Sequence, residues 1–182
     1  GGLFMSNFIC MEAVRSLQAY PTARLAGPGA TARFNSIIVG QPGSDIDLGS
    51  RVILQAPGCS AEVISRAVTR GGRIMARGHL KGETGGIRAH LECHGLILEE
   101  GGLIYAVPEL EGDHPDVDMS HEAAVGKIAQ EEVEYLMARG LSEEEATAVI
   151  VRGFLNVKIE GLPPLLEREM RKMMEISERK AL

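Results

Sequence analysis

The sequence predicts a mostly β protein, a right-handed parallel β-helix (a β-solenoid), followed by a small three-helix C-terminal domain. Three observations predict this class: regularly spaced turn glycines, period-two alternation between them, and a change to helical periodicity after residue 128. A chain of 182 residues is long enough to bury a core. We therefore expect a β-helix core domain at 1–128 and a C-terminal helical domain at 129–182.

The turn glycines recur at nearly even intervals, and each follows Pro or another Gly; they are Gly29, Gly43, Gly58, Gly72, Gly86 and Gly102. Such dipeptides favour turns, because Pro presets φ near about −65° and Gly accepts positive φ. The even interval indicates stacked coils, in which one face of every repeat lines a narrow interior. A β-sandwich, whose turns are more closely spaced, is the alternative.

Between these turns, small and aliphatic residues alternate with larger or polar ones. The shared face holds Ala61, Val63, Ser65 and Ala67, then Ile74, Ala76, Gly78 and Leu80, then Ile87, Ala89, Leu91 and Cys93. Period two is typical of strands, so we expect these residues to face the interior. The acidic, Pro- and Gly-broken segment 109–118 is expected to form a loop across the solenoid end, and 119–128 a last strand.

After residue 128 the apolar spacing becomes helical. Residues 130–139 are expected to form a helix ended by Gly140, and Ser142 with Glu145 forms a capping box at the start of a second helix. A third helix is expected from about 164 to the C-terminus, with a stripe that includes Met170, Met173 and Met174. Because Met repacks readily, this stripe either packs on the solenoid or forms an adaptable groove for another protein.

Composition excludes several classes of protein. A net charge of −6 with no basic tail argues against nucleic-acid binding, and no apolar run reaches the roughly 20 residues that span a bilayer. Three cysteines without C-x-x-C spacing argue against a disulfide framework or closed zinc site, so the expected compartment is a reducing cytoplasm. The Gly1-Gly2-Leu3 start is not a signal peptide; we expect a tag remnant or proteolytic start, with room for a longer natural protein.

Several residues could carry chemistry. Cys93 has the pattern of a small buried side chain, but its segment also carries His90, Glu92 and His94 at i, i+2 and i+4 of one strand face, a possible metal ladder. Thiolate and imidazole together suit iron, copper or zinc, and His121 has Glu122 beside it as a potential hydrogen-bond partner.

The basic run Arg66, Arg70, Arg73, Arg77 and Lys81 is interpreted as a solvated face, with a partner or phosphate contact as the alternative. Phosphate-loop, nucleophile-elbow and His-Glu-x-x-His motifs do not occur.

Four segments together resemble a known family. The runs 120–128, 135–146 and 150–154 resemble the C-terminal region of the SufB/SufD family, scaffold proteins of the SUF iron–sulfur cluster assembly system. The segment 92–98 is similar to that family's Cys-Asp-x-Leu-Leu-Leu strand. The resemblance extends from about Ala56 to Phe154, and several motifs in the right order make it more specific than any one of them.

The resemblance implies a right-handed parallel β-helix with a helical domain, working as a cytoplasmic scaffold and not as an enzyme. It implies pairing with a SufB/SufD-type subunit, as a homo- or heterodimer, and docking of a SufC-type ABC ATPase that carries the ATPase activity. The family residues implicated in building a transient iron–sulfur cluster correspond to Cys93 and His121, with Glu122 adjacent, as metal ligands. The expected partner-binding residues are Arg152, Gly153 and Phe154.

The chain departs from the family pattern. His94 replaces the usual Asp, and Ser120 looks SufD-like while Cys93 and Glu122 look SufB-like. The resemblance therefore assigns the chain to neither branch and leaves open a homodimeric scaffold with both features. Two other functions stay open: an interaction β-solenoid without a metal role, and a β-solenoid acyltransferase with His121 as general base. The second should show a hexapeptide repeat, which the observed turn spacing does not supply.

Overall fold

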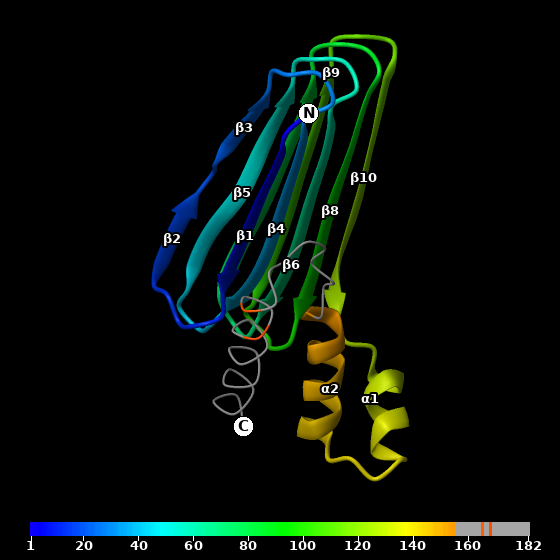
Figure 1. Cartoon of the computed structure of the whole chain (residues 1–182). Coiled ribbons are helices and arrows are strands. Elements are labelled where there is room, and N and C mark those ends of the chain that lie inside the picture. The colour runs from blue at the N-terminus through cyan, green and yellow to red at the C-terminus, as the bar shows by residue number, and fades with distance from the viewer. Residues whose placement is uncertain (156–164, 166–167, 169–182) are drawn as a thin grey trace.

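The computed structural model describes residues 1–155, 165 and 168, which form a parallel β-solenoid followed by two helices (Figure 1). The elements are β1 (Leu3–Cys10), β2 (Ser16–Ala19), β3 (Thr22–Leu25), β4 (Thr31–Gly40), β5 (Asp45–Leu54), β6 (Ser60–Thr69), β7 (Arg73–Gly82), β8 (Ile87–Ile97), β9 (Leu103–Gly112), β10 (Val117–Lys127), α1 (Gln130–Met137) and α2 (Glu143–Leu155). The expected mostly β solenoid is confirmed, and the β-sandwich alternative is wrong. The third helix and its Met stripe lie outside the described residues.

Successive strands alternate between two parallel sheets. Sheet A has the order β1-β4-β6-β8-β10, and sheet B has the order β2-β5-β7-β9 with β3 also paired to β5. Thr31 pairs with Ser60, Ser60 with Arg88, and Arg88 with Asp118, so successive coils differ slightly in length. Each glycine-punctuated repeat seen in the sequence is therefore one strand with its turn, and two repeats complete a coil.

The turn glycines have the backbone conformation expected of them at four of the six positions. Gly29, Gly43, Gly58 and Gly86 have φ between 66° and 80°. In the other two Gly-Gly pairs the left-handed residue is the first, Gly71 or Gly101, so the prediction of the second glycine in each pair is wrong. The second glycine Gly72 is needed for space instead, because a Cβ there would lie 2.6 Å from the carbonyl oxygen of Gln41.

The alternating residues face the interior as predicted. All twelve residues of the three predicted inward faces are buried, and most belong to two clusters between the sheets. Gly78 of sheet B is opposite Leu91 of sheet A, and a Cβ at residue 78 would lie 2.2 Å from Leu91 Cδ1. The large Leu91 side chain thus occupies the space left by the absence of a side chain at Gly78, which keeps the narrow interior filled.

The prediction of a loop over 109–118 is wrong. Glu109 and Glu111 continue β9 in register with His79 and Lys81 of β7, and only 113–116 separate β9 from β10. The acidic side chains alternate onto the outer face, where Lys81 Nζ is 2.7 Å from Glu111 Oε1. Acidic composition suggested a loop, but charges on the solvated face of a strand cost little when a cation is paired beside them.

The helices follow β10 after a short connection. Helix α1 ends at Met137, two residues before the predicted end at Arg139, and Gly140 takes a left-handed φ of 99°. The predicted capping box forms in both directions: the Ser142 amide donates to Glu145 Oε2 at 2.8 Å, and the Glu145 amide donates to Ser142 Oγ at 3.2 Å. Among the described residues, none of the helices is both long and apolar enough to cross a membrane.

Helix α2 seats on the outer face of sheet A. Figure 1 shows both helices beyond the end of the solenoid toward which the strands of sheet A run. The seat is an apolar patch at the ends of these strands, formed by Ile37, Val39, Val68 and Leu96. Val151, Phe154 and Leu155 of α2 pack on it, and Leu155 is buried. The amphipathic helix therefore gains its stability from packing on the sheet.

Candidate functional site

The candidate residues lie on β8 and β10, the last two strands of sheet A. In their parallel register Leu91 pairs with His121, Glu92 with Glu122, and Cys93 with Ala123. Since side chains of one register row share a face, His121 is on the inner side with Cys93, and Glu122 is on the outer side. The three predicted metal ligands therefore do not converge on one point within a single copy of the chain.

Cys93 is enclosed by the solenoid. Its exposed fraction is 1%, and burial raises the pKa of its thiol to about 11, with the negative charge of Glu92 as the next cause. The positive charge of Arg66 opposes these effects without cancelling them. The thiol is therefore protonated near neutral pH, and the thiolate that binds metals or attacks sulfur is scarce.

His121 is exposed although it points inward. Within the part of the chain that the structure describes, β10 pairs only with β8, so the inner face of the last coil is open on one side. Cys93 lies on the neighbouring strand, two positions further along the same face. The structure therefore brings the predicted sulfur and imidazole to the same end of the solenoid, the first covered and the second open.

On the outer face, the predicted row of His90, Glu92 and His94 does share one side of β8. His90 Nδ1 lies 2.9 Å from Ser120 Oγ, and His94 Nε2 lies 3.2 Å from Glu122 Oε1. Within 1–155, 165 and 168, no group of three or more His, Cys, Asp or Glu side chains is arranged to hold a metal ion. The row is therefore a ladder of side-chain pairs and forms no closed ligand set.

The basic run contributes ion pairs to both sheets. Arg66 contacts Glu92, Arg77 contacts Asp47, and Lys81 contacts Glu111. The interpretation as a simply solvated face missed these partners, since each lies on a neighbouring coil, far away in the sequence. The partner of Arg66 could not be identified from the sequence without the register of the coils.

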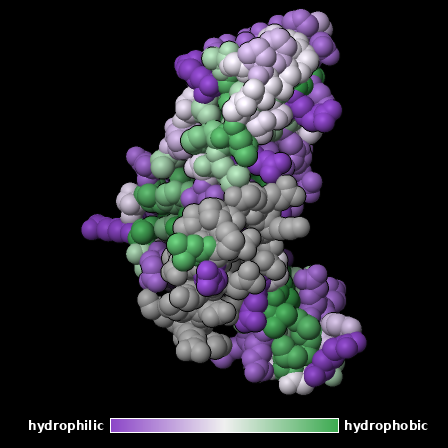
Figure 2. All heavy atoms as spheres, viewed as in Figure 1, coloured by the Kyte–Doolittle hydropathy of each residue, from purple (hydrophilic) through white to green (hydrophobic). Residues whose placement is uncertain are grey.

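The predicted partner-binding residues lie at the end of α2. Arg152 and Gly153 are exposed, while Phe154 is half-buried, with its ring centroid 5.8 Å from the Arg66 guanidinium carbon. Other apolar side chains of the helices are exposed, namely Tyr135, Met137 and Val149. Figure 2 shows hydrophobic surface along α2. The helical part thus keeps apolar surface in addition to the face that it uses to seat on sheet A.

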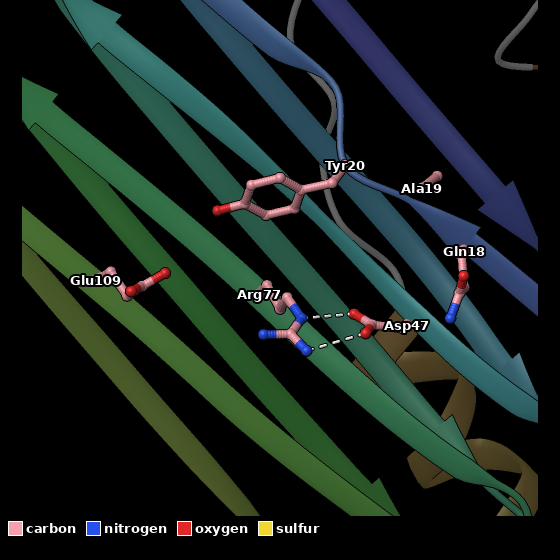
Figure 3. Close-up of a pocket in the computed structure, with 6 residues that line it drawn as sticks. All are labelled: Gln18, Ala19, Tyr20, Asp47, Arg77 and Glu109. Atoms are coloured by element: carbon pink, nitrogen blue, oxygen red, sulfur yellow. Dashed lines mark hydrogen bonds and ion pairs between the residues drawn. The ribbon is translucent and has the colours of Figure 1, made fainter.

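A separate hollow of about 450 Å³ lies on the outer face of sheet B (Figure 3); it is lined by Gln18, Ala19, Tyr20, Asp47, Arg77 and Glu109. Arg77 donates to both oxygens of Asp47, at 2.6 Å and 3.0 Å. This hydrogen bonding lowers the pKa of Asp47 below its usual range. Burial and the charge of Glu109 raise the pKa of Tyr20. The two charged groups Asp47 and Arg77 already satisfy each other, and the hollow is on the sheet that does not carry Cys93.

The chain is thus a parallel β-solenoid protein in which α1 and α2 form a helical module, with α2 packed on the outer face of sheet A. A covered cysteine and an exposed histidine lie on β8 and β10, at one end of sheet A. Residues 10–154 match the family described as SUF system FeS cluster assembly, SufBD core domain. The chain belongs to the SufB/SufD family.

Curated relatives agree with this assignment. An iron–sulfur cluster assembly SufBD family protein of Archaeoglobus fulgidus is 50% identical over 182 residues, covering 100% of this chain and 49% of its own. One of Methanothermobacter thermautotrophicus is 53% identical over 96% of this chain and 43% of its own, and one of Staphylococcus epidermidis is 35% identical over 86% and 34%. The chain thus spans less than half the length of these relatives.

Proposed function

We propose that this chain is the cluster-building part of a scaffold subunit in iron–sulfur cluster assembly, located in the cytoplasm. Membership of the SufB/SufD family supports a role in such assembly. One observation carries the finer proposal: Cys93 and His121 share the inner face of β8 and β10, beside the open end of the solenoid. All three cysteines are free, as thiols in a reducing compartment are.

We infer that the scaffold pairs with a like subunit, identical or different, through this end. Within the described residues, β10 and β9 each have a strand on one side only, so both sheets present unpaired backbone groups. Such edges are templates for another strand unless charges or bulges protect them. The stretch from Ala123 to Gly126 carries no charge, which favours strand pairing there.

Pairing also accounts for the split ligand set. An edge strand places His121 on one side and Glu122 on the other, so a strand added along β10 would bring new side chains beside both. The cluster is the cargo of this site: the Cys93 thiol would lose its proton on binding iron, with His121 or Glu122 as a further ligand. Sulfur would reach Cys93 by attack of its thiolate on the outer sulfur of a donor persulfide, with the donor thiolate as the leaving group. Protonation and burial would protect the sulfur until the partner and iron arrive.

The ATPase is proposed to dock on the helical module. Arg152, Gly153 and Phe154 remain the proposed contact, and the exposed side chains of Tyr135, Met137 and Val149 extend it with apolar surface. Hydrophobic and aromatic side chains of this kind are enriched at the centres of protein interfaces. The scaffold itself would hold and position the cluster, and ATP hydrolysis would belong to the SufC-type partner.

Anaerobic reconstitution with iron and sulfide, in the co-expressed complex, tests the cluster proposal. Cys93→Ala should abolish the iron–sulfur absorbance, and His121→Ala should reduce it, while Cys10→Ala serves as the matched thiol control. Full absorbance in the Cys93→Ala complex would reject the ligand role. The absence of absorbance in the unmodified complex would favour an interaction module without a metal role.

A separate measurement tests docking and pairing. Native mass spectrometry should find two scaffold-type subunits together with the ATPase, and Arg152→Glu should release the ATPase while leaving the scaffold pair intact. A monomeric scaffold, or an Arg152→Glu complex that keeps its ATPase, would contradict the proposed contacts.

A further inference from the structure

Arg66 connects the helical module to sheet A. It lies on the outer face of β6, in register with His94 of β8, and its side chain is 17% exposed. Its guanidinium is 5.8 Å from the centroid of the Phe154 ring on α2, and its Nη2 contacts Glu92 Oε1 on β8. Its Nη1 is buried and has no hydrogen-bond partner among the described residues.

The contacts continue from Glu92 to the edge strand. The same Oε1 atom of Glu92 is 3.5 Å from His94 Nδ1, and His94 Nε2 is 3.2 Å from Glu122 Oε1 on β10. Phe154, Arg66, Glu92, His94 and Glu122 therefore form an unbroken chain of side-chain contacts from α2 through β6 and β8 to β10. We name these five residues the outer-face relay.

The two carboxylates compete for one imidazole. A neutral imidazole has one N–H donor and one acceptor nitrogen, so His94 cannot donate to Glu92 and Glu122 at once unless it is protonated. Arg66 forms a charge-assisted contact with the Glu92 carboxylate. This contact weakens the interaction of the same carboxylate with His94 Nδ1. The position of the guanidinium then decides how His94 is shared with Glu122.

The Phe154 ring in turn restrains the guanidinium. A cation over an aromatic face is attracted by the ring, and the attraction grows when the site is desolvated. With Nη1 buried and unpartnered among the described residues, Arg66 gains hydrogen bonds by moving to water once the ring withdraws. Movement of Phe154 is therefore enough to change the hold of Arg66 on Glu92.

We propose that Arg66 is a positioning residue that couples the seating of α2 to the orientation of the His94–Glu122 pair on β10. Its role in assembly rests on the proposed function: a protein bound at the end of α2 that draws Phe154 off Arg66 would reset a proposed cluster ligand, Glu122, through Glu92 and His94.

The test is the ring ¹⁵N and ¹H NMR spectrum of the full chain, recorded without iron, sulfide or partner. Phe154→Leu keeps an apolar side chain on the seat but removes the ring, and Arg66→Met removes the cation. Both should shift the His94 ring signals in the same direction. The His90 signals, from a ring that contacts Ser120 on the same strands, should stay in place.

Val151→Ala is the matched control, because Val151 packs on the same seat of α2. It should leave His94 unchanged. In the double variant, Phe154→Leu should add no further shift once Arg66 is Met, since contacts within one network are not additive.

Three results would overturn the relay. The His94 ring signals could stay in place in Phe154→Leu, they could shift equally in Val151→Ala, or the shifts could be fully additive in the double variant. These readings need no cluster, so they are independent of the reconstitution that tests the proposed function. If the His94 signals behave as expected but the complex assembles no cluster on reconstitution, the proposed function is rejected and the relay stands.

Discussion

Cys93 and His121 lie on the same inner face of two adjacent parallel strands, with Ala123 between the cysteine and the open edge of the solenoid. The sulfur is covered and protonated, whereas the imidazole is exposed. Within a single copy of the chain the thiol is therefore both shielded from solvent and protonated near neutral pH.

The buried Cys93 thiol should react slowly with alkylating reagents. A pKa of about 11 for Cys93, against 9.0 for an ordinary thiol, leaves about 100-fold fewer thiolates near neutral pH. Iodoacetamide should modify the half-buried Cys10 first, and the Cys93 rate should rise steeply as the pH approaches 11. Peptide mapping by mass spectrometry gives both rates, and equal rates near neutral pH would contradict the buried state.

The interior leaves no room at Gly78. A methyl group there would meet Leu91 Cδ1 at 2.2 Å, and Leu91 is fully buried. Gly78→Ala should therefore lower the free energy of unfolding by about 1–3 kcal/mol through overpacking. Urea denaturation measures the change. Gly126→Ala is the control, because a Cβ at that position meets no atom within 4 Å, and a similar loss in the control would exclude packing as the cause.

The Asp47–Arg77 pair should make stability depend on pH. Hydrogen bonding from Arg77 lowers the pKa of Asp47 in the folded state, so the stabilisation is present above the usual carboxyl pKa and is lost as the pH falls through the lowered value. Asp47→Asn should lower the Tm at neutral pH, and the difference from the unmodified chain should vanish in strong acid.

Asp45 provides the comparison for this pair. It contacts Arg73 at 2.7 Å, but both side chains are more exposed than Asp47 and Arg77. Asp45→Asn should therefore change the Tm less. A thermal scan over a series of pH values measures both variants, and a difference at Asp47 that persists in strong acid would rule out the charged pair as its source.

The capping box should control the opening of α2. Ser142→Ala removes the acceptor for the Glu145 amide, and loss of such a cap costs about 1 kcal/mol. Hydrogen exchange of the first-turn amides of α2 should speed up accordingly, whereas Ser142→Asp should preserve protection. Hydrogen bonding from Ser142 also lowers the pKa of Glu145, so acid should weaken the box from its other side. Unchanged exchange in Ser142→Ala would show that packing alone holds the turn.

The general architecture could be predicted because it depends on short-range rules. Alternation at 87–93 assigned Cys93 to the interior, and Ser142 followed by Glu145 marked the start of α2. The same rule places His121 and Glu122 on opposite faces, since neighbours on a strand always diverge. Their failure to converge could therefore have been read from the sequence once 117–127 was recognised as a strand.

Local sequence patterns were enough to predict most of the turns, the inward-facing residues of 61–93 and the start of α2, because each of these depends on a few neighbouring residues. Which residues of neighbouring coils meet is known only from the folded chain, since coils of slightly unequal length shift the register in ways that no local pattern records. That register brings Cys93 beside Ala123, Glu92 beside Glu122, and Arg66 beside His94. The packing of α2 on sheet A also places Phe154 beside Arg66. No local pattern predicts this contact, because an apolar helix face can pack on any complementary patch that folding brings within its reach.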